Sequence, residues 1–170
     1  AADRMIARLS DLLRMTLDLE DTQVTTLRQE IQFVECYLEI QFTRFRDRLR
    51  TEMAIPTSRL DAEVPTLILQ PIVENAIRHG IAPRSTPGTV YLFAGTDNGR
   101  LKLTIIDDGA GLGPGWEERR SSGLGVRNTR DRLTALYGAE QSFDIATNDY
   151  GGVTVTISLP LRGVAEENSA

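Results

Sequence analysis

The sequence has 170 residues, of which 41% are hydrophobic, so it can build the core of one ordinary domain with a small appendage. Its formal net charge of -5 and pI near 5.0 argue against a nucleic-acid partner. A single cysteine, Cys36, excludes an internal disulfide framework and a multi-cysteine metal site. No apolar run reaches membrane-spanning length, so we expect no membrane contact by this segment.

Two amphipathic helices are predicted at the start of the chain. In the first, over residues 5–19, apolar residues recur at spacings of three and four, namely Ile6, Leu9, Leu13 and Leu17. The second begins after Thr26, which can form a capping box with Gln29, and its apolar series ends at Phe45. These helices either pack within the chain or form a bundle at a dimer interface. Because the sequence starts in helical rhythm without Met, we expect a piece of a longer protein.

The remaining chain predicts a helical layer on a mostly antiparallel sheet. Helices are expected over residues 70–80 and in the stretch that ends at Gly138. Strands are expected over residues 51–55, 89–94, 101–105, 142–147 and 153–159. Strands and helices do not alternate strictly, which argues against a doubly wound parallel sheet.

The stretch 70–80, QPIVENAIRHG, gathers a carboxylate, an amide, a guanidinium and the chain's one histidine on a predicted helix: Glu74, Asn75, Arg78 and His79. An asparagine oxygen can bind a hard cation that takes its other ligands from water and phosphate. The guanidinium one turn away can meet the phosphate charge. The alternative is a solvated helix edge with an ion pair between Glu74 and Arg78.

Two glycine segments are the other candidates for a ligand site. Asp107 ends an apolar strand and is followed by Gly109 and Gly111, so a flat ligand can approach the backbone closely. A carboxylate only accepts hydrogen bonds, and it would therefore favour the amino group of adenine over the carbonyl group of guanine. A tight acidic turn is the alternative.

The second glycine segment, Gly123 to Gly125, precedes a predicted helix whose free N–H groups and positive dipole end can hold phosphate. Asn128 lies in the first turn of that helix. Residues 112–122, between the two glycine segments, have the composition of a mobile cover or of an ordinary exposed loop. No GK[ST] occurs, which excludes a P-loop.

The segments VENAIRHG, DDGAG and GLGVRN, in this order, resemble the N, G1 and G2 boxes of the gyrase, heat-shock-protein-90, histidine kinase and MutL superfamily. TLRQEIQFVECYLEIQFTRFRDRL and VPTLILQPIVENAIRHG are similar to the LytS type of sensor histidine kinase. The resemblance covers nearly the whole chain. It implies an α/β fold, a Bergerat-type two-layer sandwich with one helical layer on a mixed, mostly antiparallel sheet, preceded by two amphipathic helices.

The resemblance also implies domains and site residues. Residues 1–48 would be partial dimerisation and phosphotransfer helices, 49–162 the catalytic ATP-binding domain, and 163–170 a loose tail. Asn75 would bind Mg2+, and Glu74 would be the general base. Arg78 would approach the phosphates and His79 would be an accessory polar contact. Asp107 would accept from adenine in a pocket shaped by Gly109 and Gly111. The other cofactor-binding residues would be Gly123, Leu124, Gly125, Asn128 and Thr154.

Two positions depart from the family pattern. Asp108 stands where asparagine is usual, and Val153 stands where threonine is expected, with Thr154 one place later. These departures support an alternative, a nucleotide-binding module without turnover. A further alternative is a superfamily kinase that acts on serine of a regulatory protein. The family's phosphoacceptor histidine has no candidate here and is expected upstream.

The function implied is transfer of the γ-phosphoryl group of ATP to that upstream histidine, with ATP and Mg2+ as cofactors. The expected partners are a response regulator, an upstream sensor region, and a second copy of the chain that binds through the N-terminal helices. The expected location is cytoplasmic, whether or not the parent protein is anchored in a membrane.

Overall fold

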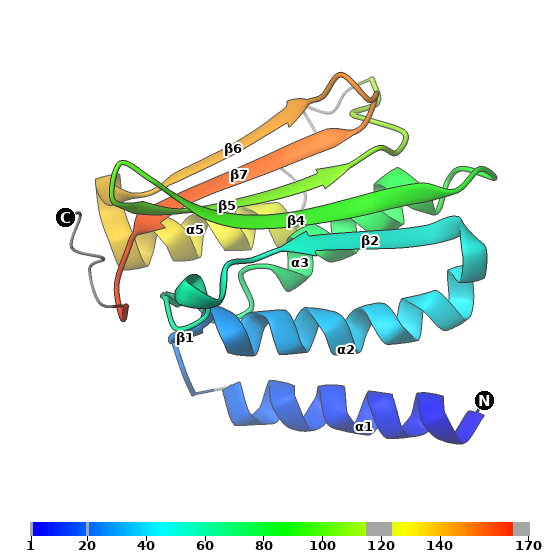
Figure 1. Ribbon diagram of the computed structural model, residues 1–170, viewed down its shortest axis with the longest axis horizontal. Coiled ribbons are helices and arrows are strands. Elements are labelled where there is room, and N and C mark those ends of the chain that lie inside the picture. Colours follow the sequence, from blue (N-terminus) through cyan, green and yellow to red (C-terminus); the bar gives the residue numbers. More distant parts are fainter. Residues whose placement is uncertain (1, 20, 115–123, 165–170) are drawn as a thin grey trace.

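The computed structural model describes residues 2–19, 21–114 and 124–164 of the chain (Figure 1). Its helices are α1 (Ala2–Leu19), α2 (Leu27–Phe45), α3 (Gln70–Asn75) and α5 (Leu124–Tyr137), and a π-helix, η3 (Ala76–Ile81), continues α3. The strands are β1 (Val24–Thr26), β2 (Leu49–Ala54), β3 (Glu63–Pro65), β4 (Gly88–Asp97), β5 (Arg100–Asp107), β6 (Ser142–Thr147) and β7 (Val153–Pro160). Every helix and strand that the sequence predicted is present, with shifted ends.

Five strands form one mixed sheet in the order β2-β4-β5-β7-β6. The pair β2 and β4 is parallel, and the other three pairs are antiparallel. The hairpin between β4 and β5 turns at Asn98 and Gly99, whose φ angles of 51° and 73° are the two successive positive values that a tight hairpin needs. The predicted mostly antiparallel α/β sandwich is therefore confirmed.

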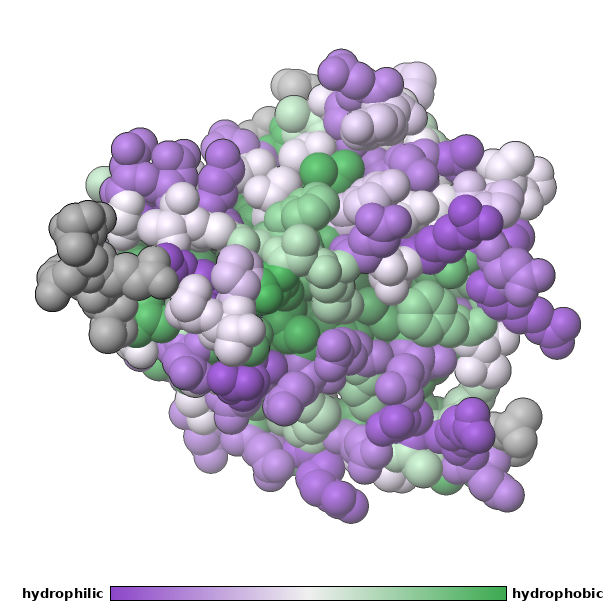
Figure 2. Space-filling view, viewed as in Figure 1, coloured by the Kyte–Doolittle hydropathy of each residue, from purple (hydrophilic) through white to green (hydrophobic). Residues whose placement is uncertain are grey.

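One face of the sheet carries the core. Along β4 and β5 the buried residues alternate with less buried ones, and Val90, Leu92 and Leu103 belong to one cluster with Leu133 of α5. Helices α3 and α5 lie behind the sheet in Figure 1, so the opposite face is open. Figure 2 shows apolar surface near the middle of that open face. Phe93 on this face is 37% exposed and its ring stacks on Tyr91 at a centroid distance of 6.3 Å.

Helices α1 and α2 form an antiparallel pair, with α1 on the side of α2 away from the sheet (Figure 1). Thr26 caps α2 and forms the predicted capping box with Gln29. The buried Cys36 of α2 faces α1, where its Sγ lies 3.5 Å from the Arg8 carbonyl oxygen. The other side of α1 exposes four apolar residues that share a helical stripe: Ile6, Leu9, Leu13 and Leu17.

A small second sheet, which the sequence did not predict, pairs β1 with β3. It joins the start of α2 to the segment that leads into α3. The backbone N–H groups of Leu27 and Arg28 extend this connection by donating to Ala62 and Leu60. Helix α2 is thus attached to the α/β sandwich by main-chain bonds. Among the helices described, none is both long and apolar enough to cross a membrane.

Candidate nucleotide site

Helix α3 and its continuation η3 carry the polar residues of the N box. Pro71 lies in the first turn of α3, where a missing N–H group costs nothing, and Ile72 and Val73 are buried against the core. After Asn75 the α-helix widens to a π-helix that continues to Ile81. The predicted helix over residues 70–80 is therefore present, but its second half has π instead of α geometry. Single π turns of this kind are frequent at functional sites.

The four polar residues of this segment differ in exposure. Glu74 and Asn75 are half-buried, whereas Arg78 and His79 are exposed. Glu74 accepts a hydrogen bond from the Gln70 amide, with 3.3 Å between Nε2 and Oε2. Among the ion pairs of the described residues, none joins Glu74 to Arg78, so the alternative of a simple helix-edge ion pair is not what the structure contains.

Asp107, at the end of β5, is a buried carboxylate that is 4% exposed. Its Oδ1 accepts from the backbone N–H groups of Gly109, at 2.9 Å, and Val153, at 3.4 Å. Within the described part of the chain, no hydrogen-bond donor is found for Oδ2. Burial raises the pKa of Asp107, and the two backbone hydrogen bonds oppose that rise. The arrangement leaves one oxygen of a desolvated carboxylate available to a ligand.

Backbone packs against Asp107 because glycines surround it. A Cβ built on Gly80, the penultimate residue of η3, would lie 2.7 Å from Asp107 Oδ1. A Cβ on Gly109 would overlap the backbone of Gly80, and Ala110 donates to the Gly80 carbonyl at 3.0 Å. Gly111 has a φ of 75° and packs against Gly151. The G1 segment and the end of η3 are therefore in direct contact, as a shared pocket wall requires.

The start of α5 meets the other end of the same helical segment. A Cβ on Gly125 would lie 3.9 Å from Cβ of Pro71 and 4.0 Å from the amide nitrogen of Asn75. Asn128 is exposed on the first turns of α5. The structure thus brings α3, η3, β5 and α5 together, with Asp107 at Gly80 and Gly125 at Asn75. The site runs along one helical segment, from its π end to its α end.

Some predicted site residues fall outside the described part of the chain. Gly123 lies there, and so does most of the stretch 112–122 that we interpreted as a cover or an exposed loop. Leu124 begins α5, but its side chain is also outside the description. The roles expected for them stay predictions.

Asn148, in the turn between β6 and β7, is a site residue that the sequence analysis missed. Its side-chain amide donates to the backbone carbonyl of Asp107 at 2.9 Å, and its Oδ1 accepts from Tyr150 and Gly152. Thr154 Oγ1 lies 3.4 Å from the same amide nitrogen, so the structure places Thr154 beside Asn148. The segment NDYGG was interpreted only as a connecting turn. The available signal was an asparagine in a short turn that ends in two glycines, Gly151 and Gly152.

Asp108, one of the two departures from the family pattern, has a structural partner. Its Oδ1 accepts from the Thr89 backbone N–H at 2.8 Å, and Arg84 donates to its carbonyl oxygen. The carboxylate therefore holds the start of β4 beside the end of β5. An asparagine oxygen could accept the same hydrogen bond, so this departure leaves the geometry of the pocket unchanged.

Tyr37 of α2 is a second residue near the N box that sequence reasoning missed. Burial raises its pKa to about 12, and the negative charge of Glu74 adds to the effect, while Arg44 and Arg78 oppose it. The charges of the N box thus act on the phenol of Tyr37. Helix α2 therefore contributes to the surroundings of the candidate base.

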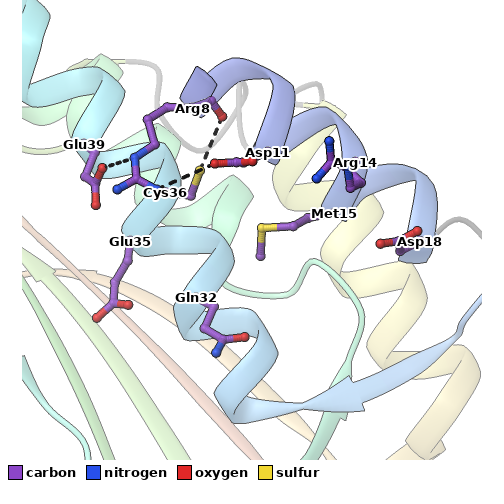
Figure 3. A pocket seen from close by; sticks show the side chains of 9 residues that line it. All are labelled: Arg8, Asp11, Arg14, Met15, Asp18, Gln32, Glu35, Cys36 and Glu39. Atoms are coloured by element: carbon purple, nitrogen blue, oxygen red, sulfur yellow. Dashed lines mark hydrogen bonds and ion pairs between the residues drawn. The ribbon is translucent and has the colours of Figure 1, made fainter. Parts of the chain in front are cut away.

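A groove lined by charged side chains lies away from this site. Figure 3 shows it between α1 and α2, with a volume of about 390 Å³. It is lined by Arg8, Asp11, Arg14, Met15, Asp18, Gln32, Glu35, Cys36 and Glu39. Arg8 forms an ion pair with Glu39 across it and another with Asp11 along α1. We assign the chemistry to the Asp107 and Asn75 region instead, because this groove is a charged seam between two helices.

The α/β sandwich thus carries a buried carboxylate framed by glycines near Gly80 and an asparagine amide at the junction of α3 and η3, which are features suited to a nucleotide. The family model described as "Histidine kinase-, DNA gyrase B-, and HSP90-like ATPase" matches residues 61–163, and one described as "Histidine kinase" matches residues 1–49. The chain belongs to the histidine kinase-, DNA gyrase B- and HSP90-like ATPase family.

Curated relatives and solved structures agree with this assignment. Sensor histidine kinase BtsS of Escherichia coli is 34% identical over 164 residues, which cover 96% of this chain and 28% of that protein. Sensor protein LytS of Oceanobacillus iheyensis is 28% identical over 95% of this chain and 29% of its own. The chain thus spans less than a third of the curated relatives it matches.

Among solved structures, the histidine kinase domain of a blue-light activated kinase from Erythrobacter litoralis aligns with a TM-score of 0.67. The alignment covers 92% of this chain and 75% of that chain at 19% identity. The catalytic domain of histidine kinase ThkA aligns with a TM-score of 0.63, over 81% of this chain and 94% of its own at 15% identity. At these identities the likeness establishes the fold alone.

Proposed function

We propose that this chain is the catalytic part of a sensor histidine kinase, which binds Mg-ATP and transfers its γ-phosphoryl group to a histidine upstream of these residues. The observation that carries the proposal is the convergence at α3 and η3. Asp107 meets the π end of this segment at Gly80, and Gly125 meets its α end at Asn75. An adenine acceptor and a metal ligand thus lie along one helix, with a helix N-terminus beside the metal ligand.

The residues present fit an adenine nucleotide. Asp107 Oδ2 can accept from the amino group of adenine, while Gly109 and Gly111 leave room for the ring to approach the backbone. The start of α5 at Leu124 and Gly125, preceded by Gly123 and followed by Asn128, offers free N–H groups for phosphate. We also place Thr154 in this pocket, where the Asn148 amide donates to its hydroxyl.

Metal binding and phosphoryl transfer fall to the N box in this proposal. The Asn75 side-chain oxygen would bind Mg2+, which takes its other ligands from phosphate and water. Arg78 and His79 are exposed beside that position and would contact the nucleotide. Glu74 would accept a proton from the incoming imidazole. Bound Mg-ATP supplies the phosphoryl group, and its metal supplies positive charge. The chain's own contribution is to position the nucleotide and to stabilise the charge that develops on the phosphoryl group.

The proposed partners follow from the exposed face of α1 and from the relatives. The stripe of Ile6, Leu9, Leu13 and Leu17 has the spacing of a helix-bundle seam, and we propose that a second copy of the chain covers it. We further propose an upstream sensor region and a response regulator as partners, and a cytoplasmic location for these residues. The boundaries at residues 48, 162 and 170 remain our proposal for the domains.

The alternatives have less support. Asp108 has a structural hydrogen bond that asparagine could also make, so it no longer favours a module without turnover. Val153 contacts Asp107 through its backbone N–H. Any residue but proline supplies that group, so valine in place of threonine keeps this contact. A serine kinase remains the second candidate for the acceptor, although the paired helices α1 and α2 favour a histidine kinase.

The test is phosphoryl transfer from γ-labelled ATP to a separate helical segment that carries the upstream histidine of the parent protein. We expect the chain to label that segment with acid-labile phosphate and to stay unlabelled itself, since exposed His79 adjoins the metal ligand and is badly placed for in-line attack. Asn75→Ala should abolish labelling without lowering the melting temperature. Acid-labile label on the chain that is lost in His79→Gln would contradict the proposal.

A further inference from the structure

Glu30 of α2 is a fully buried carboxylate, 0% exposed, that the proposed chemistry does not use. Its two oxygens accept from backbone N–H groups of the turn before α3, Oε1 from Leu67 at 2.6 Å and Oε2 from Leu69 at 3.1 Å. Burial raises the pKa of Glu30, and these backbone hydrogen bonds oppose the rise. An apolar residue of the same size would leave these two N–H groups without an acceptor, so the carboxylate is tied to the conformation of this turn.

The turn that Glu30 holds has an unfavourable backbone conformation. Leu67 has a φ of 55°, in the left-handed region that residues with a Cβ seldom adopt. Such conformations persist only where the surroundings enforce them, and they occur often at functional sites. Here the carboxylate receives the N–H groups on both sides of Ile68, which keeps the turn closed.

The same turn is held from a second side by α5. Arg132 donates from its guanidinium to the carbonyl oxygen of Thr66, and its charge also lowers the pKa of Glu30. The Thr66 hydroxyl donates to the Thr22 carbonyl at 2.6 Å, which anchors the turn to the chain just before β1. Glu30 of α2 and Arg132 of α5 therefore both form hydrogen bonds with the backbone of this one short turn.

This turn leads directly into the proposed metal site. Helix α3 begins at Gln70, right after the turn, and carries Glu74 and Asn75 at its end. Helix α5 touches α3 near Asn75 through Gly125 and touches the turn through Arg132. By contrast, Asp107 is fixed by Gly109, Val153 and Asn148, which lie outside the turn. The two ends of the nucleotide site therefore have separate supports.

We propose that Glu30 and Arg132 are positioning residues that clamp the turn Thr66–Leu69 and thereby set where α3 presents Glu74 and Asn75 to the metal and the phosphates. The clamp rests on the proposed function, because it assumes that Asn75 binds Mg2+. It also gives α2, the helix paired with α1, a direct mechanical connection to the metal side of the site. The adenine side has further contacts of its own at Gly109, Val153 and Asn148.

The test is calorimetry of the whole chain with two ligands, Mg-ATP and metal-free ADP. Glutamine at position 30 keeps one acceptor but turns an N–H2 group towards the other backbone donor, so Glu30→Gln should loosen the turn. We expect a roughly tenfold loss of Mg-ATP affinity, because Mg2+ demands a near-ideal arrangement of its ligands and Asn75 would be displaced, with little change for metal-free ADP. The matched control is Glu35→Gln, an exposed acid on the same helix.

Arg132→Gln tests the other side of the clamp, with Arg28→Gln as a control that removes an exposed arginine from α2. If both residues act on one turn, the double variant should lose less Mg-ATP affinity than the product of the single losses. Amide hydrogen exchange of Leu67 and Leu69 should speed up in Glu30→Gln. A role in stability alone would lower the melting temperature and leave the ratio of the two affinities unchanged.

The outcomes separate the clamp from the proposed function. If the unmodified chain bound neither ligand, the nucleotide proposal itself would fail. If it bound both and Glu30→Gln behaved like Glu35→Gln in affinity and exchange, the clamp would be refuted while the proposed function stood. Equal losses for both ligands would also refute the clamp, because they would mean a general change of the pocket. Should Glu30→Gln fail to fold, Arg132→Gln decides by the same criteria.

Discussion

At the scale of single residues, we propose that Asp107 selects adenine over guanine. An asparagine there would keep an acceptor for Gly109 but would present donor hydrogens where the adenine amino group also donates. We expect Asp107→Asn to weaken Mg-ATP binding by roughly ten- to a hundredfold, the range for losing a hydrogen bond to a charged group. Affinity for Mg-GTP should fall less or rise, since guanine presents a carbonyl group.

Calorimetry with both nucleotides measures this difference, with Asp144→Asn as a control that removes an exposed carboxylate from β6. Equal affinities of the unmodified chain for ATP and GTP would remove Asp107 from the adenine pocket. So would an Asp107→Asn chain that binds ATP like the unmodified one.

Gly80 shows how little space separates η3 from β5. A methyl group there would lie 2.7 Å from the Asp107 carboxylate, which is closer than real Cβ atoms come. We expect Gly80→Ala to lower the free energy of unfolding by about 1–3 kcal/mol, the usual cost of overpacking, and to weaken ATP binding. Gly95→Ala is the control because nothing lies within 4 Å of its added carbon. Equal stabilities of the two variants in urea titrations would show that η3 moves aside freely.

At the scale of elements, α1 exposes apolar side chains on one face. Leu13 and Leu17 are 64% and 67% exposed on the face turned away from α2. An exposed apolar helix stripe of this kind usually marks an interaction surface. We expect a concentration-dependent dimer in sedimentation experiments, and Leu13→Glu should convert it to a monomer.

The same variant should leave the melting temperature of the monomer unchanged, because Leu13 makes no core contact there. Ala7→Glu adds the same charge on another exposed part of α1 and should not affect association. A Leu13→Glu chain that dimerises like the unmodified one would place the partner elsewhere.

At the scale of the whole molecule, buried carboxylates make stability depend on pH. The folded state raises the pKa of Glu30 above its ordinary value of 4.5, chiefly through burial, so the folded chain holds that proton more tightly than the unfolded chain. The stability from this group is therefore fully present below pH 4.5 and is lost as pH rises through the folded pKa. Glutamine at position 30 does not titrate.

The measurable consequence is a difference between two melting series. As pH rises from about 4.5, the melting temperature of the unmodified chain minus that of Glu30→Gln should fall. Taking this difference cancels the titration of the many groups that both chains share. If the difference grew with pH instead, the folded state would favour the ionised Glu30, and the backbone hydrogen bonds would outweigh burial.

The sequence by itself determined the local structure and the family. Spacing of apolar residues, the capping box at Thr26, and the turn residues Asn98 and Gly99 act over a few positions, so the helices, strands and hairpins followed from neighbouring residues. The three boxes likewise pointed to Asp107 and Asn75, because each box is a short contiguous segment.

Only the tertiary structure decided how these segments meet. The packing of Gly80 on Asp107 and the hydrogen bond from Asn148 to the Asp107 backbone join residues that are far apart in the sequence. The burial of Glu30 against the turn before α3 is of the same kind, because a glutamate in an amphipathic pattern predicts a solvated face. Local propensity carries no information about which distant backbone groups will need an acceptor. Only the packing of the folded chain brings such a group and its acceptor together.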